Sequence, residues 1–426
     1  MKIYLENIGK LSQTEISIDG ITVIAGKNGT GKSTISKALY SIFSSFYNYN
    51  QKVTDLRNQM VLSTLRVYPN SIVFREFNKV QTESFLLNLY ENREDFKKDK
   101  EVLKNTILEF ISSVDKSNSN RILTKINSND KIDDEVLDSI VEILFMEEEK
   151  LLKYIVKQTF TNEFNKQIQN LDKPSEESLL SLNIKNNTIT IKIDQNNDYT
   201  ISDPLLLTKK IVYIDDPYII DQVSEYIPFN NGLTLLDNHR DDLLRLLIKE
   251  RSPESLLVDD SLNKIDHYLN TTTKINIVKE SNEYYYNSVN SDTNIDIKNA
   301  STGLKTFIII KMLLENGSLQ KNGTIILDEP ETHLHPDWQI IFAELIVLLN
   351  KYLGIHILIN SHSPYFVRAI EVYSAKHKVA DKCNYYLTYD DIDTGTSKVD
   401  DVTNSLNEIY SKLAEAFDIL EEDSVI

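Results

Sequence analysis

A cluster of glycines near the N-terminus is the feature that most constrains the fold of this chain. Three of the eleven glycines in the 426 residues stand within the segment Gly26-Lys27-Asn28-Gly29-Thr30-Gly31-Lys32-Ser33. This segment matches G-x-x-x-x-G-K-[ST], a loop that lies between a strand and a helix. An apolar run at 21–24 precedes it, and residues 34–43 after it resemble a helix. The segment therefore predicts a strand–loop–helix unit and an α/β fold.

Such a loop is suited to phosphate groups. Its glycines let backbone N–H groups converge on phosphate oxygens, and the helix N-terminus adds a favourable dipole. We expect Lys32 to reach the β- and γ-phosphates of a nucleotide and Ser33 to hold Mg²⁺. The alternative, a chance glycine turn, fits poorly in so glycine-poor a chain. The predicted nucleotide-binding residues here are Gly26, Asn28, Gly29, Thr30, Gly31, Lys32, Ser33 and Thr34.

A second segment ends an apolar run in two carboxylates. The run 324–327 is followed by Asp328 and Glu329, which is the Walker B pattern. A buried strand of this kind would deliver Asp328 to the coordination sphere of Mg²⁺. Glu329, one residue on, would stand where a base can polarise an attacking water. The alternative is an ordinary strand with an acidic end.

Two further segments complete the predicted site. Residues 355–359 are apolar and lead into Asn360-Ser361-His362-Ser363-Pro364, so His362 could point at a γ-phosphate. The tripeptide Ser301-Thr302-Gly303 opens a helical run at 305–314, and the free N–H groups there, at Ser301 and Gly303, suit a phosphate. The same tripeptide is also an ordinary helix N-cap.

The remaining pattern indicates one head with an insertion. We expect strands at 2–6, 15–18, 71–77, 189–193, 211–214 and 284–286, with turns at 19–20 and 186–187, and helices at 233–249 and 402–420. Glycine is absent from about 81 to 170, helical spacing is found at 96–114 and 132–164, and Glu147 to Glu149 read as a solvated face. The predicted domains are a head over 1–80 and 181–426 and a helical insertion over 81–180.

Composition narrows the class of protein. The formal net charge is −18, so nucleic acid is repelled unless a local basic patch exists. One cysteine and no apolar run of membrane-spanning length favour the cytoplasm, with no membrane partner.

Taken in order, these four segments resemble ABC-type ATPase heads: an α/β fold with a mixed sheet flanked by helices. The resemblance implies ATP and Mg²⁺ as cofactors, Glu329 and His362 as catalytic residues, and Ser33 and Asp328 as metal ligands. It also implies that Ser301 and Gly303 complete the site of another subunit, in a homodimer or larger homo-oligomer. Glu329-Pro330-Glu331 through Pro336, together with 360–364, are similar to the OLD-like (AAA15) ATPases of bacterial anti-phage systems such as Septu and Gabija.

Several departures shape the expectation. Ala300, Thr302 and Leu304 depart from the transporter signature, His335 replaces the usual D-loop aspartate, and the Q-loop residue is open, with Gln81 a candidate by distance only. OLD nucleases carry a Toprim domain with acidic motifs after the switch histidine. Here Asp390-Asp391-Ile392-Asp393 has carboxylates but no upstream glutamate partner motif, so we interpret it as an acidic turn.

We therefore expect an ATPase that acts as sensor or regulator of an anti-phage defence module and controls a separately encoded effector, a nuclease or toxin. One alternative is a DNA-repair or SMC-like DNA-associated ATPase, although the insertion lacks the sustained heptads of a coiled coil. Another is a self-contained OLD-like nuclease with a cryptic metal site.

Overall fold

The computed structural model describes residues 1–66, 79–115, 132–170, 176–226, 238–250, 260–280, 283–288 and 293–424. The strand expected at 71–77 lies outside these ranges, as does the start of the helix expected at 233–249. Backbone contacts divide the chain into two compact units. The first comprises Met1–Asn48, Val156–Phe229 and Leu236–Ile426, and the second comprises Tyr49–Ile155 and Asn230–Leu235. No described helix is long and apolar enough to cross a bilayer.

The first unit is built on an 11-stranded mixed sheet with the order β6-β5-β4-β1-β2-β14-β13-β3-β12-β11-β7. Five neighbouring strands, β13, β3, β12, β11 and β7, run parallel, while β4, β5, β6 and β1 pair antiparallel. The strands are β1 (Lys2–Ile8), β2 (Leu11–Ser17), β3 (Ile21–Gly26), β4 (Ser178–Ile184), β5 (Asn187–Ile193), β6 (Tyr199–Ser202), β7 (Ile211–Ile214), β11 (Thr324–Asp328), β12 (His356–Ser361), β13 (Cys383–Asp390) and β14 (Ser397–Asp401). The expected α/β class with a mixed sheet and flanking helices is confirmed.

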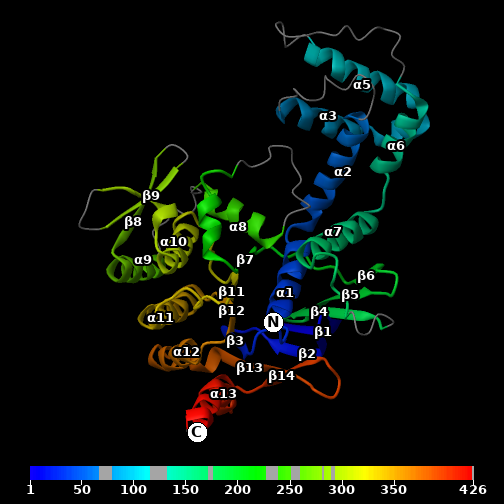
Figure 1. Ribbon diagram of the computed structural model, residues 1–426. Coiled ribbons are helices and arrows are strands. Elements are labelled where there is room, and N and C mark those ends of the chain that lie inside the picture. The colour runs from blue at the N-terminus through cyan, green and yellow to red at the C-terminus, as the bar shows by residue number, and fades with distance from the viewer. Residues whose placement is uncertain are drawn as a thin grey trace. The chain divides into compact units, whose positions relative to one another are not determined.

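The parallel strands β3, β7, β11 and β12 are buried on both faces, as their apolar runs require. On β11, Ile325 and Leu327 belong to the large core cluster, whereas Ile326 between them does not. Ile357 and Ile359 of β12 alternate in the same way. One face therefore packs on α9 to α12, and α1 contacts β7, β11 and β12 on the opposite side (Figure 1).

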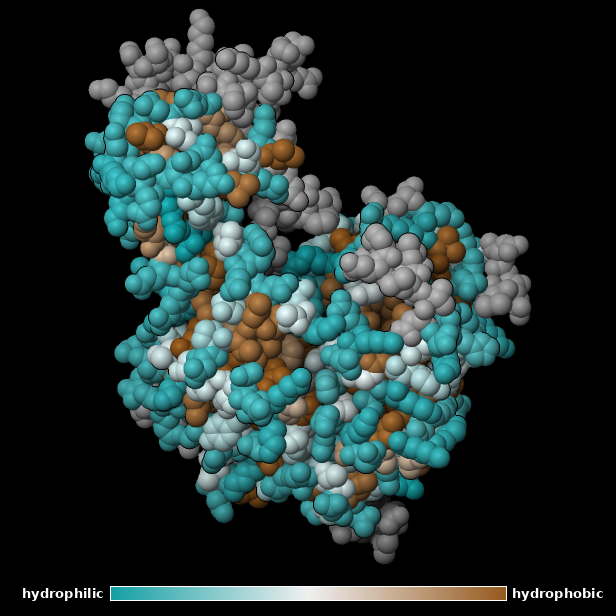
Figure 2. All heavy atoms as spheres, turned by 180° about the vertical axis from the view of Figure 1, so that it is seen from behind, coloured by the Kyte–Doolittle hydropathy of each residue, from teal (hydrophilic) through white to brown (hydrophobic). Residues whose placement is uncertain are grey.

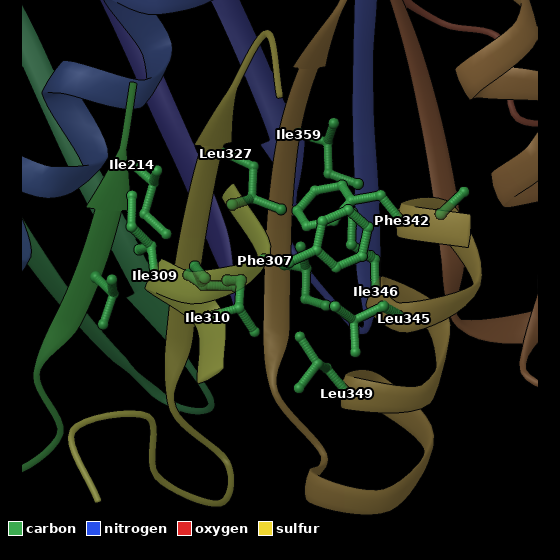
Figure 3. Packing of buried hydrophobic residues seen from close by; sticks show 14 of the residues in the cluster. Ile214, Phe307, Ile309, Ile310, Leu327, Phe342, Leu345, Ile346, Leu349 and Ile359 are labelled. Atoms are coloured by element: carbon green, nitrogen blue, oxygen red, sulfur yellow. The ribbon is translucent and has the colours of Figure 1, made fainter. Parts of the chain in front are cut away.

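Helices and a small second sheet cover this core. Figure 3 shows how Phe307 of α10 and Phe342 of α11 pack against Leu327 and Ile359 of the strands. The helices are α1 (Lys32–Phe46), α8 (His239–Ile248), α9 (Asp260–Thr273), α10 (Thr302–Glu315), α11 (Pro336–Leu353), α12 (Pro364–Lys376) and α13 (Asn407–Ser424), with 3-10 turns η2 (Pro217–Gln222), η4 (Ile297–Asn299) and η5 (Ala380–Lys382). The second sheet has β8 (Ile275–Glu280), β9 (Glu283–Ser288) and β10 (Ile295–Asp296).

The second unit is helical where it is described. It contains α2 (Tyr49–Arg66), α3 (Lys79–Glu91), α4 (Arg93–Lys98), α5 (Lys100–Asp115), α6 (Asp134–Leu144) and the start of α7 (Glu148–Glu163). Helical spacing at 96–114 and 132–164 predicted α5, α6 and α7, whereas α2 was missed. Its Val61 and Leu65 lie in the same buried cluster as Phe85, Leu103 and Ile140. The predicted domain boundaries at 80/81 and 180/181 stay predictions, and the compact units change at 48/49 and 155/156.

Two expected turns and one acidic run also lie within the described residues. Asp19-Gly20 turns the chain between β2 and β3, with Gly20 at φ 64°. The turn expected at 186–187 is wrong by one residue, since Ile184 pairs with Asn187 and Lys185 takes the positive φ of 57°. Glu147 to Glu149 are exposed, as expected. Hydrophilic side chains cover most of the face in Figure 2, which fits the charged composition.

Candidate functional site: a phosphate-loop cavity and its carboxylates

The glycine loop between β3 and α1 adopts a backbone that other residues rarely take. Gly26, Gly29 and Gly31 have φ of 156°, 80° and 89°. At Gly26 space is also limiting, because an added Cβ would stand 2.1 Å from Thr388 Oγ1 on the neighbouring strand β13. Gly31 immediately precedes α1, so the helix N-terminus opens at the loop. At Gly26, therefore, the positive φ and the close contact together leave room only for glycine.

Lys32 holds the loop together from inside. Its side chain is 4% exposed, and Nζ donates to the carbonyl oxygens of Gly26 and Lys27, both at 2.9 Å. Burial lowers the pKa of Lys32, while the carboxylates of Glu329, Asp328 and Glu331 act in the opposite direction. A buried ammonium group is a strong charge-assisted donor to anionic oxygens.

A cavity of about 530 Å³ opens beside the loop. Lys32 and Glu329 line it, both within the first unit. Five more of the predicted nucleotide-binding residues also line it: Asn28, Gly29, Gly31, Ser33 and Thr34. Residues that sequence reasoning did not select also line it: Gly9, Lys10, Gln167, Gln169 and Asn170. The buried hydroxyl of Thr30 contacts Thr388 Oγ1 at 2.6 Å and donates to Lys27 O. Its side chain therefore supports the loop from behind.

Asp328 ends β11 in a defined orientation. Asn360 Nδ2 donates to its Oδ1 at 2.8 Å and also to Ser36 Oγ on α1. Tyr213 on β7 donates its hydroxyl to Oδ2 of Asp328 at 3.0 Å. Each carboxylate oxygen thus has one protein donor and keeps acceptor capacity. Carboxylate and hydroxyl oxygens are the ligands that Mg²⁺ prefers, so Asp328 and the exposed Ser33 fit such an ion chemically.

Glu329 and His362, the two predicted catalytic residues, lie together. His362 Nδ1 is 3.4 Å from Glu329 Oε1, and Lys32 Nζ is 4.0 Å from the same oxygen. Glu329 has φ of 48°, a left-handed conformation that is uncommon for glutamate. Its N–H donates to Asn360 O at 3.0 Å, which holds this strained backbone. Strain of this kind concentrates at functional sites.

Glu331 organises the loop that carries His362. It is 2% exposed, and its Oε1 accepts from Ser361 Oγ at 2.6 Å and from the N–H groups of His362 and Ser363. Burial raises the pKa of Glu331, while these hydrogen bonds act in the opposite direction. One buried carboxylate therefore ties the segment after β11 to the segment after β12.

The structure of one chain does not bring Ser301 or Gly303 into this cavity. Ser301 is exposed and caps α10, accepting from Leu304 N at 3.4 Å, so the N-cap interpretation holds in the single chain. Thr302 Oγ1 lies 2.9 Å from the Tyr218 hydroxyl. The weak Q-loop candidate Gln81 lies in α3 of the second unit.

A buried ionic cluster surrounds His239, whose ring packs on Tyr213, the donor to Asp328. His239, 6% exposed, places Nδ1 2.7 Å from Glu163 Oε1 and Nε2 3.1 Å from Asp215 Oδ2, while Arg240 also donates to Asp215. Burial lowers the pKa of His239, but the two carboxylates outweigh this and raise it to about 9. The ring is therefore cationic at neutral pH and stacks on Tyr213, with 4.1 Å between centroids.

Sequence reasoning missed Tyr213, Asn360, Glu331 and His239 as functional candidates. A signal did exist for Tyr213: it is the one polar-tipped side chain in the run Ile211-Val212-Tyr213-Ile214. A buried tyrosine hydroxyl usually finds a partner. Its partner could not be read from the run itself.

One family model and several solved structures match this chain. The model of the family described as "AAA ATPase domain" matches residues 1–367. Among solved structures, the chain is similar to the SMC head domain from Thermotoga maritima at 11% identity and TM-score 0.40, covering 94% of this chain and 98% of that one.

It is also similar to a structure of the SmcHead bound to the C-winged helix domain of ScpA, at 11% identity and TM-score 0.42, covering 94% and 96% of the two chains. A third is the Smc head domain with an extended coiled coil bound to the C-terminal domain of ScpA derived from Pyrococcus furiosus, at 11% identity and TM-score 0.40, covering 99% and 98%. The family match spans most of the sequence and all four site segments, and the chain therefore belongs to the AAA ATPase domain family.

Proposed function

We propose that this chain is a Mg²⁺-dependent ATPase that hydrolyses ATP to ADP and phosphate. The observation that carries the proposal is the meeting of Lys32, Glu329 and His362 beside the glycine-loop cavity. Lys32 would neutralise the β- and γ-phosphates, and the loop N–H groups would hold them. Ser33 and Asp328 would hold Mg²⁺, which supplies charge neutralisation to the phosphates when bound.

Glu329 is the candidate general base. Its carboxylate faces both a cation and His362, and its backbone N–H is held by the Asn360 carbonyl. It would accept the proton of the attacking water, and His362 would stabilise the charge that develops on the transferred phosphate oxygens. Glu331 keeps His362 in place through the backbone of the loop.

Two variants test this assignment. Lys32→Ala is expected to abolish nucleotide binding, whereas Glu329→Gln should bind ATP and turn it over at least about 100-fold more slowly. Binding is measured with a fluorescent ATP analogue and turnover by phosphate release. Lys37→Ala on the same helix is the charge-matched control. Unchanged affinity in Lys32→Ala would refute the phosphate-loop site, and near-normal turnover in Glu329→Gln would mean a different base.

We further propose that ATP binding assembles two or more copies and that the assembly regulates a separately encoded effector in an anti-phage module. The support is the sequence resemblance of 329–336 and 360–364 to the OLD-like ATPases. The Glu329→Gln chain, expressed with its genomic neighbours and purified with Mg-ATP, should carry a stoichiometric neighbour with a nuclease or toxin fold. A homo-oligomer alone would redirect attention to DNA binding and to Asp390–Asp393, where Asp391 pairs with Lys398.

A further inference from the structure

The register of the sheet brings one tyrosine to the Walker B aspartate. Tyr213 of β7 is the parallel partner of Ile326 on β11, two residues before Asp328. Residues 326 and 328 point to the same face because side chains alternate along a strand. Asp328 in turn pairs with Asn360 on β12. Strands on both sides of β11 therefore offer a polar side chain to one carboxylate.

The contacts use both carboxylate oxygens. Tyr213 donates to Oδ2 at 3.0 Å and Asn360 donates to Oδ1 at 2.8 Å. Tyr213 is 2% exposed and Asn360 is fully buried, so water does not compete for these hydrogen bonds. Two donors on opposite oxygens fix the rotation of the Asp328 carboxylate about its own axis, which a single donor would leave free.

The ring of Tyr213 is held in turn. His239 stacks on it with an interplanar angle of 22°, and Tyr40 of α1 packs against both rings at 6.0 Å and 5.9 Å. His239 is anchored on opposite ring edges by Glu163 and Asp215. The stack therefore joins β7, α8, α1 and the end of α7 around one hydroxyl group.

We propose that Tyr213 is a positioning residue for the magnesium site: its hydroxyl orients the Asp328 carboxylate, and the stack with His239 holds its ring. The inference rests on the proposed function, since it assigns Asp328 to Mg²⁺. Partners that orient metal ligands typically contribute about 10- to 100-fold to metal affinity.

The test separates magnesium binding from nucleotide binding. For Tyr213→Phe, which removes only the hydroxyl, the dissociation constant of a fluorescent ATP analogue is measured in MgCl₂ and again in EDTA. We expect the tightening by Mg²⁺ to shrink about 10-fold while the EDTA value stays unchanged. Tyr40→Phe removes a hydroxyl from the other tyrosine of the stack and should leave both values unchanged.

Each other outcome is decisive. An unchanged Mg²⁺ effect in Tyr213→Phe would overturn the inference, as would equal weakening in MgCl₂ and EDTA, which would indicate a general structural role. The unsubstituted chain tests the proposed function separately. If it binds no nucleotide, or binds it without regard to Mg²⁺, the proposed site itself fails and the inference fails with it.

Discussion

Burial and the neighbouring charges act in opposite directions on the pKa of the His239 imidazole, and the effect of the charges is larger. Its pKa rises from the ordinary 6.5 to about 9 because Glu163 and Asp215 favour the protonated ring. A group whose pKa is raised by folding stabilises the protein fully below the unfolded value, and that stabilisation is lost as the pH rises through the folded value. The stabilisation by His239 is therefore lost between pH 6.5 and 9, and it amounts to up to about 3 kcal/mol of the free energy of unfolding.

His239→Gln should expose this pH dependence. The groups that face the ring are Glu163, Asp215, Arg240, Tyr213 and Tyr40. We expect the variant to lose most stability at pH 6 and the difference from the unsubstituted chain to shrink toward pH 10. Urea unfolding at both pH values measures it, with the exposed His267→Gln as control. A constant difference would mean that folding does not shift the pKa of His239.

Residues within contiguous motifs could be predicted, but their partners could not. Lys32, Glu329 and His362 each stand at a fixed spacing in a local pattern, and the structure places them together. Tyr213 and Asp328 are 115 residues apart in sequence. Only the pairing of β7 with β11 makes them neighbours, and register is decided by the whole core. Asn360 and Glu331 were missed for the same reason, because their partners Asp328 and Ser361 lie on other strands.

At the scale of elements, Glu331 is the link between the segments after β11 and β12. Glu331→Ala would leave Ser361 Oγ and the N–H group of His362 without their buried acceptor, while the Ser363 N–H would keep only Ser361 Oγ at 3.1 Å. Unpaired buried donors are costly, so we expect a loss of about 3 kcal/mol in unfolding free energy. Chemical denaturation checks this against Asp381→Ala, an exposed carboxylate. A loss equal to that control would mean that the loop holds its shape without Glu331.

Elements with a clear period were predicted, and those whose pattern is weak were missed. The apolar runs of β7, β11 and β12 are fully buried parallel strands, and the alternating Ile189, Ile191 and Ile193 form the half-buried β5. The helix expected at 402–420 begins at Asn407, with Ile409 buried and Leu406 and Leu413 packed on the core. Helix α2 escaped because its polar residues obscure a narrow apolar stripe.

At the scale of the whole molecule, the cavity of one chain holds only part of the predicted ATP site. The cavity lacks Ser301 and Gly303, which lie at the start of α10, and Ser301 is exposed. An exposed hydroxyl and free N–H groups at a helix N-terminus are suited to an anion brought by another molecule. The proposed assembly of two copies around ATP uses this surface.

Ser301→Arg tests that assembly because it adds bulk and charge at the helix start. The change also removes the N-cap, which costs about 1 kcal/mol, so Ser301→Ala is the matched control that loses the cap alone. We expect Ser301→Arg to bind ATP like the unsubstituted monomer, to lose hydrolysis, and to stay monomeric in the Glu329→Gln background with Mg-ATP. A fluorescent ATP analogue measures binding, phosphate release measures hydrolysis, and sedimentation velocity measures the monomeric state. If dilute monomers hydrolyse ATP as fast as the assembled form, each chain completes its own site and Ser301 serves only as a cap.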